Sequence, residues 1–446
     1  MPLSGSELAR KVVHMGVGLI AFSLRYLGPF YSALLAAAAL GMNLFVLPRI
    51  GGRRLWRETD HAAGTSIGII LYPFCVLLLI LLFYQKLEIA AAAWGILGFG
   101  DGMASVAGMA LGRRKLPWNP QKSWAGSFAY VLFGGAAATA LLLWTAPGLY
   151  AVPFALAVCY GAALLAAALE SLPQGLDDNL GVPLVSALFL LGLVLTQGRW
   201  SGYLVTDGLA LRLLLAAAIN GALAAAAYAA RTVDLSGVIA GFFVGFTIYA
   251  FLDWKCFLLL LAFFVIGSGC TKLGYKRKAA ANLAQEKGGR RGARHAFANA
   301  GVATACALFA ALTGYPVLFG LAFAAAFATA AADTASSEVG QLLGRRTFLI
   351  TTFRPVPRGT EGAVSLEGTL AGVFASLLIG ALGALAGLYG WAGVLPVVVA
   401  AFVGTTFESA VGAALEKRRL LDNEALNFLN TLVGALVATV FTPWVI

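Results

Sequence analysis

Residues 316–346, PVLFGLAFAAAFATAAADTASSEVGQLLGRR, decide the fold class of this 446-residue chain. As a helix, the apolar run is long enough to cross the roughly 30 Å of hydrocarbon in a bilayer. It contains one aspartate, Asp333, and ends on Arg345 and Arg346. A carboxylate inside an apolar helix is costly unless it faces water or a partner. The stretch therefore predicts a membrane-spanning helix with a functional site toward its basic end.

Residues 88–114, EIAAAAWGILGFGDGMASVAGMALGRR, repeat this pattern. Both stretches read Asp-x3-Ser-x2-Gly-x3-Gly-Arg-Arg, which gives Asp101, Ser105, Gly108, Gly112, Arg113 and Arg114 against Asp333, Ser337, Gly340, Gly344, Arg345 and Arg346. Offsets of 4, 7 and 11 from the aspartate lie on one helical face. The glycines also suit close helix packing, but the aspartates predict function.

The composition extends the membrane prediction to the whole chain, because 60% of its residues are hydrophobic and only 11% are charged. We expect an all-α polytopic membrane protein of about fifteen transmembrane helices. The expected spans are 12–24, 29–47, 64–84, 88–111, 124–146, 151–170, 181–196, 207–230, 235–252, 255–273, 296–313, 315–340, 362–389, 391–415 and 425–444.

The repeat predicts two seven-helix domains in parallel orientation, at 1–200 and 233–446, joined by a linker transmembrane helix within 201–232. An odd number of crossings per repeat would invert the second copy, and the linker restores its orientation. An N-inside, C-outside topology places 26 of the 31 basic residues on the cytoplasmic side, with Arg25, Lys86, Arg199, Arg212 and Lys255 as exceptions. The net charge of +11 is therefore a topology signal and does not indicate nucleic acid.

A second shared pattern lies after a proline-bearing loop. Lys122-Ser123-Trp124-Ala125-Gly126 is expected to open one helix, and Arg358-Gly359-Thr360-Glu361-Gly362 its counterpart. A cation and a hydroxyl at a helix N-terminus suit phosphate, although the hydroxyl could equally be an N-cap. Further acidic pairs follow at matching cytoplasmic ends: Glu170-Ser171 and Asp178-Asn179, then Glu408-Ser409 and Asp422-Asn423.

The motifs resemble known families. GDGMASVAGMALGRRK, KSWAGS and ESLPQGLDDNLGVP in the first half look like the membrane phytol and dolichol kinases, relatives of phosphatidate cytidylyltransferases. ITTFRPVPRGTEGAVSLEGTLAG and DNEALNFLN in the second half look like phytyl-phosphate kinase. The resemblance implies a bifunctional isoprenoid salvage kinase. One half would phosphorylate a prenyl alcohol and the other its monophosphate, with CTP as donor.

This chemistry gives roles to the polar residues, because phosphoryl transfer depends on charge neutralisation and Mg²⁺ prefers carboxylate oxygens. The catalytic candidates are Asp101, Lys122, Glu170, Asp178, Asp333, Glu338, Glu361 and Glu408. Mg²⁺ ligands are expected among Asp101, Asp177, Asp178, Asp333, Glu338, Glu408 and Asp422. Phosphate contacts are expected from Arg113, Arg114, Ser123, Gly126, Asn179, Arg354, Arg358, Gly359, Thr360, Gly362 and Ser365.

Two alternatives keep the same residues. A transporter or flippase for isoprenoid phosphates would also use intramembrane carboxylates and repeats, although its site would lie near the bilayer midplane. Cytidylyl transfer would use the same metal site but release pyrophosphate. The expected partners are the bilayer, the prenyl alcohol, its monophosphate and the nucleotide. The expected location is a bacterial-type inner membrane or its equivalent, with the sites facing the cytoplasm.

Overall fold

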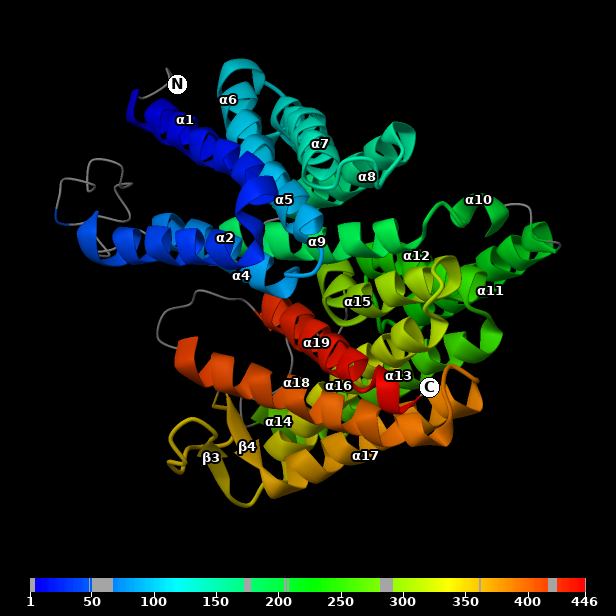
Figure 1. Cartoon of the computed structure of the whole chain (residues 1–446). Helices are drawn as coiled ribbons and strands as arrows, with labels where there is room; N and C mark the ends of the chain where they lie inside the picture. The colour runs from blue at the N-terminus through cyan, green and yellow to red at the C-terminus, as the bar shows by residue number, and fades with distance from the viewer. Residues whose placement is uncertain are drawn as a thin grey trace. The chain divides into compact units, whose positions relative to one another are not determined.

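The computed structural model describes residues 5–47, 49, 67–171, 178–203, 206, 208–280, 292–360, 362–415 and 423–445. The chain divides into two compact units, Met1–Leu195 and Thr196–Ile446, called unit 1 and unit 2 below. The described part of each unit is helical, with a small antiparallel hairpin added (Figure 1). The all-α prediction is confirmed.

Unit 1 holds the first aspartate motif. Its elements are α1 (Gly5–Leu19), α2 (Leu24–Gly41), α4 (Ile67–Leu82), α5 (Leu87–Gly95), α6 (Gly102–Leu111), β1 (Lys115–Leu116), β2 (Asn119–Ser123), α7 (Trp124–Thr145), α8 (Val152–Ser171) and α9 (Asp178–Leu195). A π-helical segment, η4 (Ile96–Asp101), joins α5 to α6 and ends on Asp101 itself. Such wide turns are rare and often lie at functional sites.

Unit 2 is organised around one long helix, α16 (Pro316–Leu343), which carries Asp333. The helix packs against α13, α15, α17, α18 and α19. Its other elements are α10 (Trp200–Tyr203), α11 (Leu209–Ala229), α12 (Leu235–Phe251), α13 (Trp254–Lys272), α14 (Tyr275–Ala280), α15 (Ala293–Leu312), β3 (Thr347–Leu349), β4 (Ala363–Ser365), α17 (Leu366–Leu385), α18 (Val394–Leu415) and α19 (Asn423–Val440). The predicted linker helix is α11.

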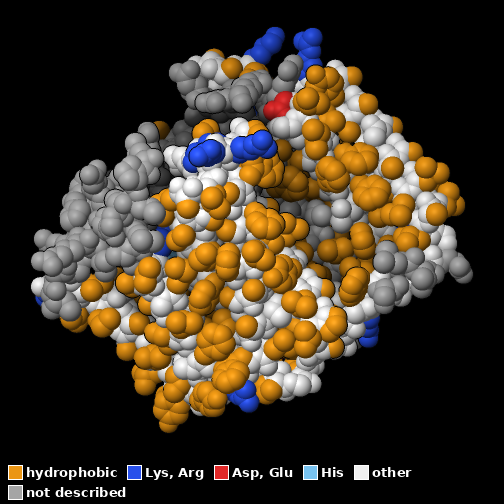
Figure 2. All heavy atoms as spheres, turned by 90° about the horizontal axis from the view of Figure 1, so that it is seen from above, with side chains coloured by type: hydrophobic (Ala, Val, Ile, Leu, Met, Phe, Trp, Pro, Cys, Tyr) orange, Lys and Arg blue, Asp and Glu red, His pale blue; other side chains and the backbone are white. Residues whose placement is uncertain are grey.

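Eleven helical segments of the described chain are long and apolar enough to cross a membrane, and Gly68–Leu82 and Leu235–Phe251 are shorter apolar helices. Large apolar side chains remain exposed on them: Phe128 is 70% exposed and Leu395 is 69% exposed. Figure 2 shows such side chains over much of one face, with lysine and arginine in a few small groups. Helices of this length with apolar outer faces are suited to lipid.

Three predicted spans differ from the structure. The segments at 12–24 and 29–47 are not separated by a loop, because both fall on one 36-residue segment, Lys11–Val46. The segment changes direction at Gly28, whose φ of 65° is non-helical, just before Pro29. Proline cannot donate a backbone hydrogen bond and crowds the preceding turn. The predicted span at 425–444 corresponds to α19, which lies outside the eleven and carries the polar residues Asn427, Asn430 and Thr431.

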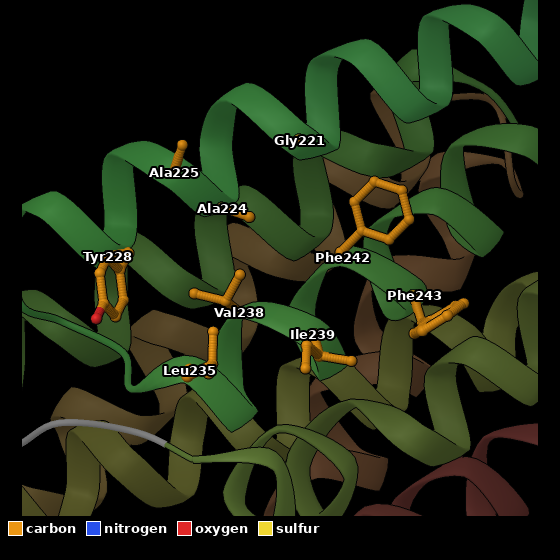
Figure 3. Close-up of a pocket in the computed structure, with 9 residues that line it drawn as sticks. All are labelled: Gly221, Ala224, Ala225, Tyr228, Leu235, Val238, Ile239, Phe242 and Phe243. Carbon is orange, nitrogen blue, oxygen red and sulfur yellow. The ribbon is translucent and has the colours of Figure 1, made fainter.

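A groove between α11 and α12 is purely a feature of apolar packing. Gly221, Ala224 and Tyr228 line one side of it, and Leu235, Ile239 and Phe242 line the other. The Tyr228 hydroxyl is the polar side-chain group among the residues drawn in Figure 3. Since none of the described residues that line it is charged, this groove does not suit a phosphate.

Small residues let α16 and α17 approach closely, and this packing is testable. A Cβ added at Gly368 would lie 2.6 Å from the Ser336 carbonyl oxygen, whereas one added at Gly241 would meet nothing within 4 Å. We expect Gly368→Ala to destabilise unit 2 by about 1–3 kcal/mol through overpacking. Gly241→Ala should leave thermal unfolding in detergent unchanged or slightly improved. Equal melting temperatures for the two variants would contradict the close contact.

Candidate functional site

Both units have the same N-cap hydrogen bond where the hairpin meets the next helix. In unit 1 the Gly126 backbone N–H donates to Ser123 Oγ at 3.2 Å, and Ser123 is the N-cap of α7. In unit 2 the Gly368 N–H donates to Ser365 Oγ, also at 3.2 Å, at the start of α17. Both serines are buried. Ser123, Gly126 and Ser365, expected on phosphate, therefore cap and pack these helices.

The motif glycines lie close to these N-cap serines. A Cβ at Gly108 would lie 3.4 Å from Ser123 Oγ, and one at Gly340 would lie 3.2 Å from Ser365 Oγ. A Cβ at Gly340 would crowd the serine and one at Gly108 would touch it, so a small residue suits this close approach to the neighbouring helix. The packing interpretation of the motif glycines is thus the one that the contacts favour.

This geometry corrects the predicted match between the two helix starts. The described residues of this segment, 358–360 and 362, do not open a helix, because α17 begins at Leu366. The strand pairs explain the error: Lys115 pairs with Ser123, eight positions on, whereas Thr347 pairs with Ser365, eighteen positions on. The counterpart of Ala125 is therefore Glu367 and not Glu361. Arg354, Arg358, Gly359 and Thr360 lie in the longer loop of the second hairpin.

Asp101 of unit 1 lies next to two basic side chains. Lys11 Nζ donates to its Oδ2 at 2.7 Å, and His14 Nε2 lies 3.4 Å from the same oxygen. Lys11 is only 7% exposed. His14 also contacts the Leu97 carbonyl oxygen at 3.1 Å. From the sequence, Lys11 is only a topology signal, because ninety residues separate it from its partner.

Lys122 forms the second charged group of unit 1. Its Nζ donates to Glu170, and it lies 3.4 Å from Asp178 Oδ2. Burial alone would lower the pKa of Lys122, but Glu170 and Asp178 outweigh burial and raise it above the ordinary 10.5. The ammonium ion therefore stays charged at neutral pH, and the stabilisation is lost only as pH rises through that raised value. The structure thus brings together three of the catalytic candidates, Lys122, Glu170 and Asp178, although as an ion-paired group and not in the separate phosphate and Mg²⁺ roles expected for them.

In both units the hairpin lies against the residue that follows a candidate carboxylate. Asn119 Nδ2 donates to the Ser171 carbonyl oxygen at 3.1 Å, next to Glu170. In unit 2, Gly362 has a φ of +71°, and a Cβ there would lie 2.4 Å from the Ser409 carbonyl oxygen, next to Glu408. The second loop therefore lies against the end of α18, close to the acidic residue.

Asp333 meets a second carboxylate in unit 2, since it is hydrogen-bonded to Glu408 of α18. Two carboxylates in contact repel each other unless a proton or a cation lies between them. Glu338 lies elsewhere, because it pairs with the buried Lys278 of α14. Lys278 also donates to the carbonyl oxygens of Cys270 and Thr271, at 3.1 and 3.0 Å.

Several predicted phosphate contacts lie away from these groups. Arg113, Arg114, Arg354 and Arg358 are exposed. The Arg358 guanidinium lies 3.5 Å from the Leu342 carbonyl oxygen. The Thr360 hydroxyl donates to the Pro357 carbonyl oxygen at 2.8 Å. Asn179 lies beside Gly68 of α4. Asp177, Glu361 and Asp422 lie outside the described residues.

Asn430 of α19 is a polar residue that the sequence patterns did not single out. It is 1% exposed, and neither its Oδ1 nor its Nδ2 has a partner within the part of the chain that the structure describes. An unsatisfied buried amide is costly, so such a group indicates a ligand or water. Asn430 lies in the interior of α19, and an amide within an otherwise apolar helix is the sequence signal that could have identified it.

Mg²⁺ suits one unit better than the other. Among the described residues, no three histidine, cysteine, aspartate or glutamate side chains gather into a metal cluster. Mg²⁺, however, commonly takes one or two carboxylates together with substrate phosphates and water. Asp333 and Glu408, with the orphaned Asn430 amide, fit that requirement. Asp101 and Glu170 do not, because lysines already neutralise them.

Fold and site together define an integral membrane protein with carboxylates inside its spans. The family model "Integral membrane protein DUF92" matches residues 218–435, which include Asp333, Glu408 and Asn430. An uncharacterized membrane protein of Synechocystis is 42% identical over 44% of this chain and 77% of its own length. The chain belongs to this DUF92 family of integral membrane proteins.

Two plant proteins are also similar. Protein VTE6 of Arabidopsis thaliana is 35% identical over 47% of this chain and 66% of its own length. Phytol kinase 1 of the same plant is 28% identical over 41% of this chain and 65% of its own length. The chain thus spans just under two thirds of each of these relatives. No solved structure matches the chain.

Proposed function

We propose that the protein is a prenol kinase of the membrane, with a phosphate-transfer site in each unit. The unit 1 site would phosphorylate a prenyl alcohol, and the unit 2 site would convert the monophosphate to the diphosphate. The observation that carries the proposal is the Asp333–Glu408 carboxylate pair inside the spans of unit 2, next to the point where Gly362 of the second hairpin loop lies against Ser409. Similarity to proteins named phytol kinase supports the substrate class.

The chemistry follows from charge. In unit 1 the prenol oxygen attacks the γ-phosphorus of the nucleotide, the bond to the β-phosphate oxygen breaks, and the hydroxyl proton is released to water. In unit 2 a phosphate oxygen of the monophosphate makes the same attack. The nucleotide diphosphate is the leaving group, and CTP is the proposed donor. Mg²⁺, held by Asp333 and Glu408 in unit 2, would neutralise phosphate charge. In unit 1 the Lys122 ammonium ion would attract the donor phosphates.

The membrane arrangement is part of the proposal. We propose fifteen crossings with the N-terminus inside, counting the two arms of Lys11–Val46 on either side of Gly28 as separate crossings, so that two parallel seven-helix repeats flank the linker helix α11. The clustering of basic residues in alternate loops supports this orientation. Both sites would then face the cytoplasm, where the nucleotide is found.

The test uses CTP labelled at two positions. Purified protein in detergent or liposomes is incubated with Mg²⁺, geranylgeraniol or phytol, and CTP labelled at the α- or the γ-phosphate. We expect the γ label to enter prenyl monophosphate and then diphosphate, while the α label stays in CDP. Entry of the α label into lipid, with release of pyrophosphate, would indicate cytidylyl transfer. Movement of prenyl phosphate across liposomes without any labelled lipid would indicate a transporter.

A further inference from the structure

We propose that unit 2 alone binds a divalent cation in the absence of nucleotide, through Asp333, Glu408 and Asn430. In unit 1 the ammonium groups of Lys11 and Lys122 take the place of such an ion. The inference rests on the proposed phosphoryl transfer, because it names the positive charge that acts at each site. Its test, however, needs no substrate. It divides the two sites by the kind of positive charge that each supplies.

The charges of unit 1 exclude a second cation. Lys11 is buried and lies 2.7 Å from Asp101 Oδ2, with His14 Nε2 also at 3.4 Å from that oxygen. Lys122 contacts both Glu170 and Asp178. A divalent ion would have to displace an ammonium group and then lie next to it, and like charges at such distances repel strongly.

In unit 2 the buried lysine, Lys278, does not pair with the motif aspartate. Lys278 pairs with Glu338, which follows Asp333 by five residues on α16. The ion pairs of the described residues include none to Asp333, whose partner is the Glu408 carboxyl group. The carboxylate pair therefore has the acceptor oxygens that a hard cation requires.

Asn430 lies one helical turn from this pair. A Cβ at Gly404 would lie 2.7 Å from Thr329 Cγ2 and 2.8 Å from the Asn430 carbonyl oxygen, so α16, α18 and α19 meet at this level. Asp333 follows Thr329 by four residues, and Glu408 follows Gly404 by four. Both carboxylates are therefore one turn nearer to the hairpin end of their helices.

Helix direction makes the three side chains converge. The neighbours of Gly404, Gly412 and Gly434 show that α18 and α19 run antiparallel. Side chains lean toward the N-terminus of their own helix. Asp333 and Glu408 thus lean away from the hairpin, whereas Asn430 leans toward it. The unpartnered amide is aimed at the carboxylate pair, where its Oδ1 can bind a cation directly or through water.

Unit 1 shows what the same position looks like without a ligand. Ser186 follows Asp178 by eight residues, as Asn430 follows Asp422. Its hydroxyl donates to the Val182 carbonyl oxygen at 2.6 Å, so it is satisfied within its own helix. Ser186 is therefore the matched control for Asn430.

The experiment titrates purified full-length protein with Mn²⁺ in nucleotide-free buffer and counts free Mn²⁺ by electron paramagnetic resonance. We expect one ion per chain, displaced by Mg²⁺. Asp333→Asn and Glu408→Gln should abolish binding, and Asn430→Leu should weaken it by about tenfold or more. Ser186→Ala and the double variant Lys11→Met with Asp101→Asn should bind like the wild type.

Two ions per chain, no ion, or undiminished binding by Asp333→Asn would overturn the inference. Size-exclusion chromatography and melting temperature identify any variant that fails to fold, and Glu408→Gln then replaces Asp333→Asn. A protein that binds one Mn²⁺ ion at this site but transfers no label from CTP would keep the inference and refute the proposed function. The two failures are therefore distinguishable.

Discussion

Asp333→Asn is expected to stop diphosphate formation while prenyl monophosphate accumulates. The change removes one negative charge from the Asp333–Glu408 pair without changing side-chain volume. A cation held between them would then lose a ligand, and we expect the rate of monophosphate phosphorylation to fall by about 100-fold or more. Thin-layer chromatography of labelled lipid products, with prenyl monophosphate supplied as substrate, measures the effect.

Glu88→Gln is the matched control for this loss. Glu88 is also a buried carboxylate in an apolar helix, and it accepts a hydrogen bond from the Tyr150 hydroxyl at 3.1 Å. It lies at the start of α5, away from the charges described above. The control should retain both activities. Full diphosphate yield from Asp333→Asn would show that unit 2 does not phosphorylate the monophosphate.

Asp101→Asn is expected to block use of the free alcohol but not of supplied monophosphate. It should also lower stability by up to about 3 kcal/mol, because Lys11 would be left buried beside a neutral amide. Activity and melting temperature are measured together on the same preparation. Loss of both phosphorylation steps in a folded variant would refute two separate sites.

The double variant Lys11→Met with Asp101→Asn separates the two effects. Removing both charges takes away the unpaired ammonium ion, so stability should return toward that of the wild type. Use of the alcohol should stay lost, because the carboxylate is still absent. Recovery of activity along with stability would mean that Asp101 serves only to hold α1 against the helix that carries it.

Local sequence patterns predict much of the architecture. Apolar length predicted ten of the eleven long segments as separate spans, because a helix must satisfy its own backbone in lipid. The sequence singled out Lys122, Glu170 and Asp178 as charged residues at helix ends, but it did not predict that the lysine would pair with the two carboxylates.

Other features depend on distance in space. The sequence prediction placed the start of α17 several residues before Leu366. The length of the hairpin loop decides which residues of the two strands pair, and a match between two motifs gives no information about that length. Lys11 and Lys278 looked like topology signals until their carboxylate partners were in place. That the Asn430 amide is orphaned can be recognised only when all its neighbours are known.

The π-helical segment η4 affects how related chains should be aligned. A π turn holds one residue more than an α turn, so the chain before Asp101 is offset by one position from a regular helix. The stretch before Asp333 is α-helical throughout α16. An ungapped comparison anchored on the two aspartates therefore pairs residues that face different directions upstream of them. One gap within 96–100 restores the equivalence, and relatives lacking that extra residue should turn the whole of α5 by about 100°.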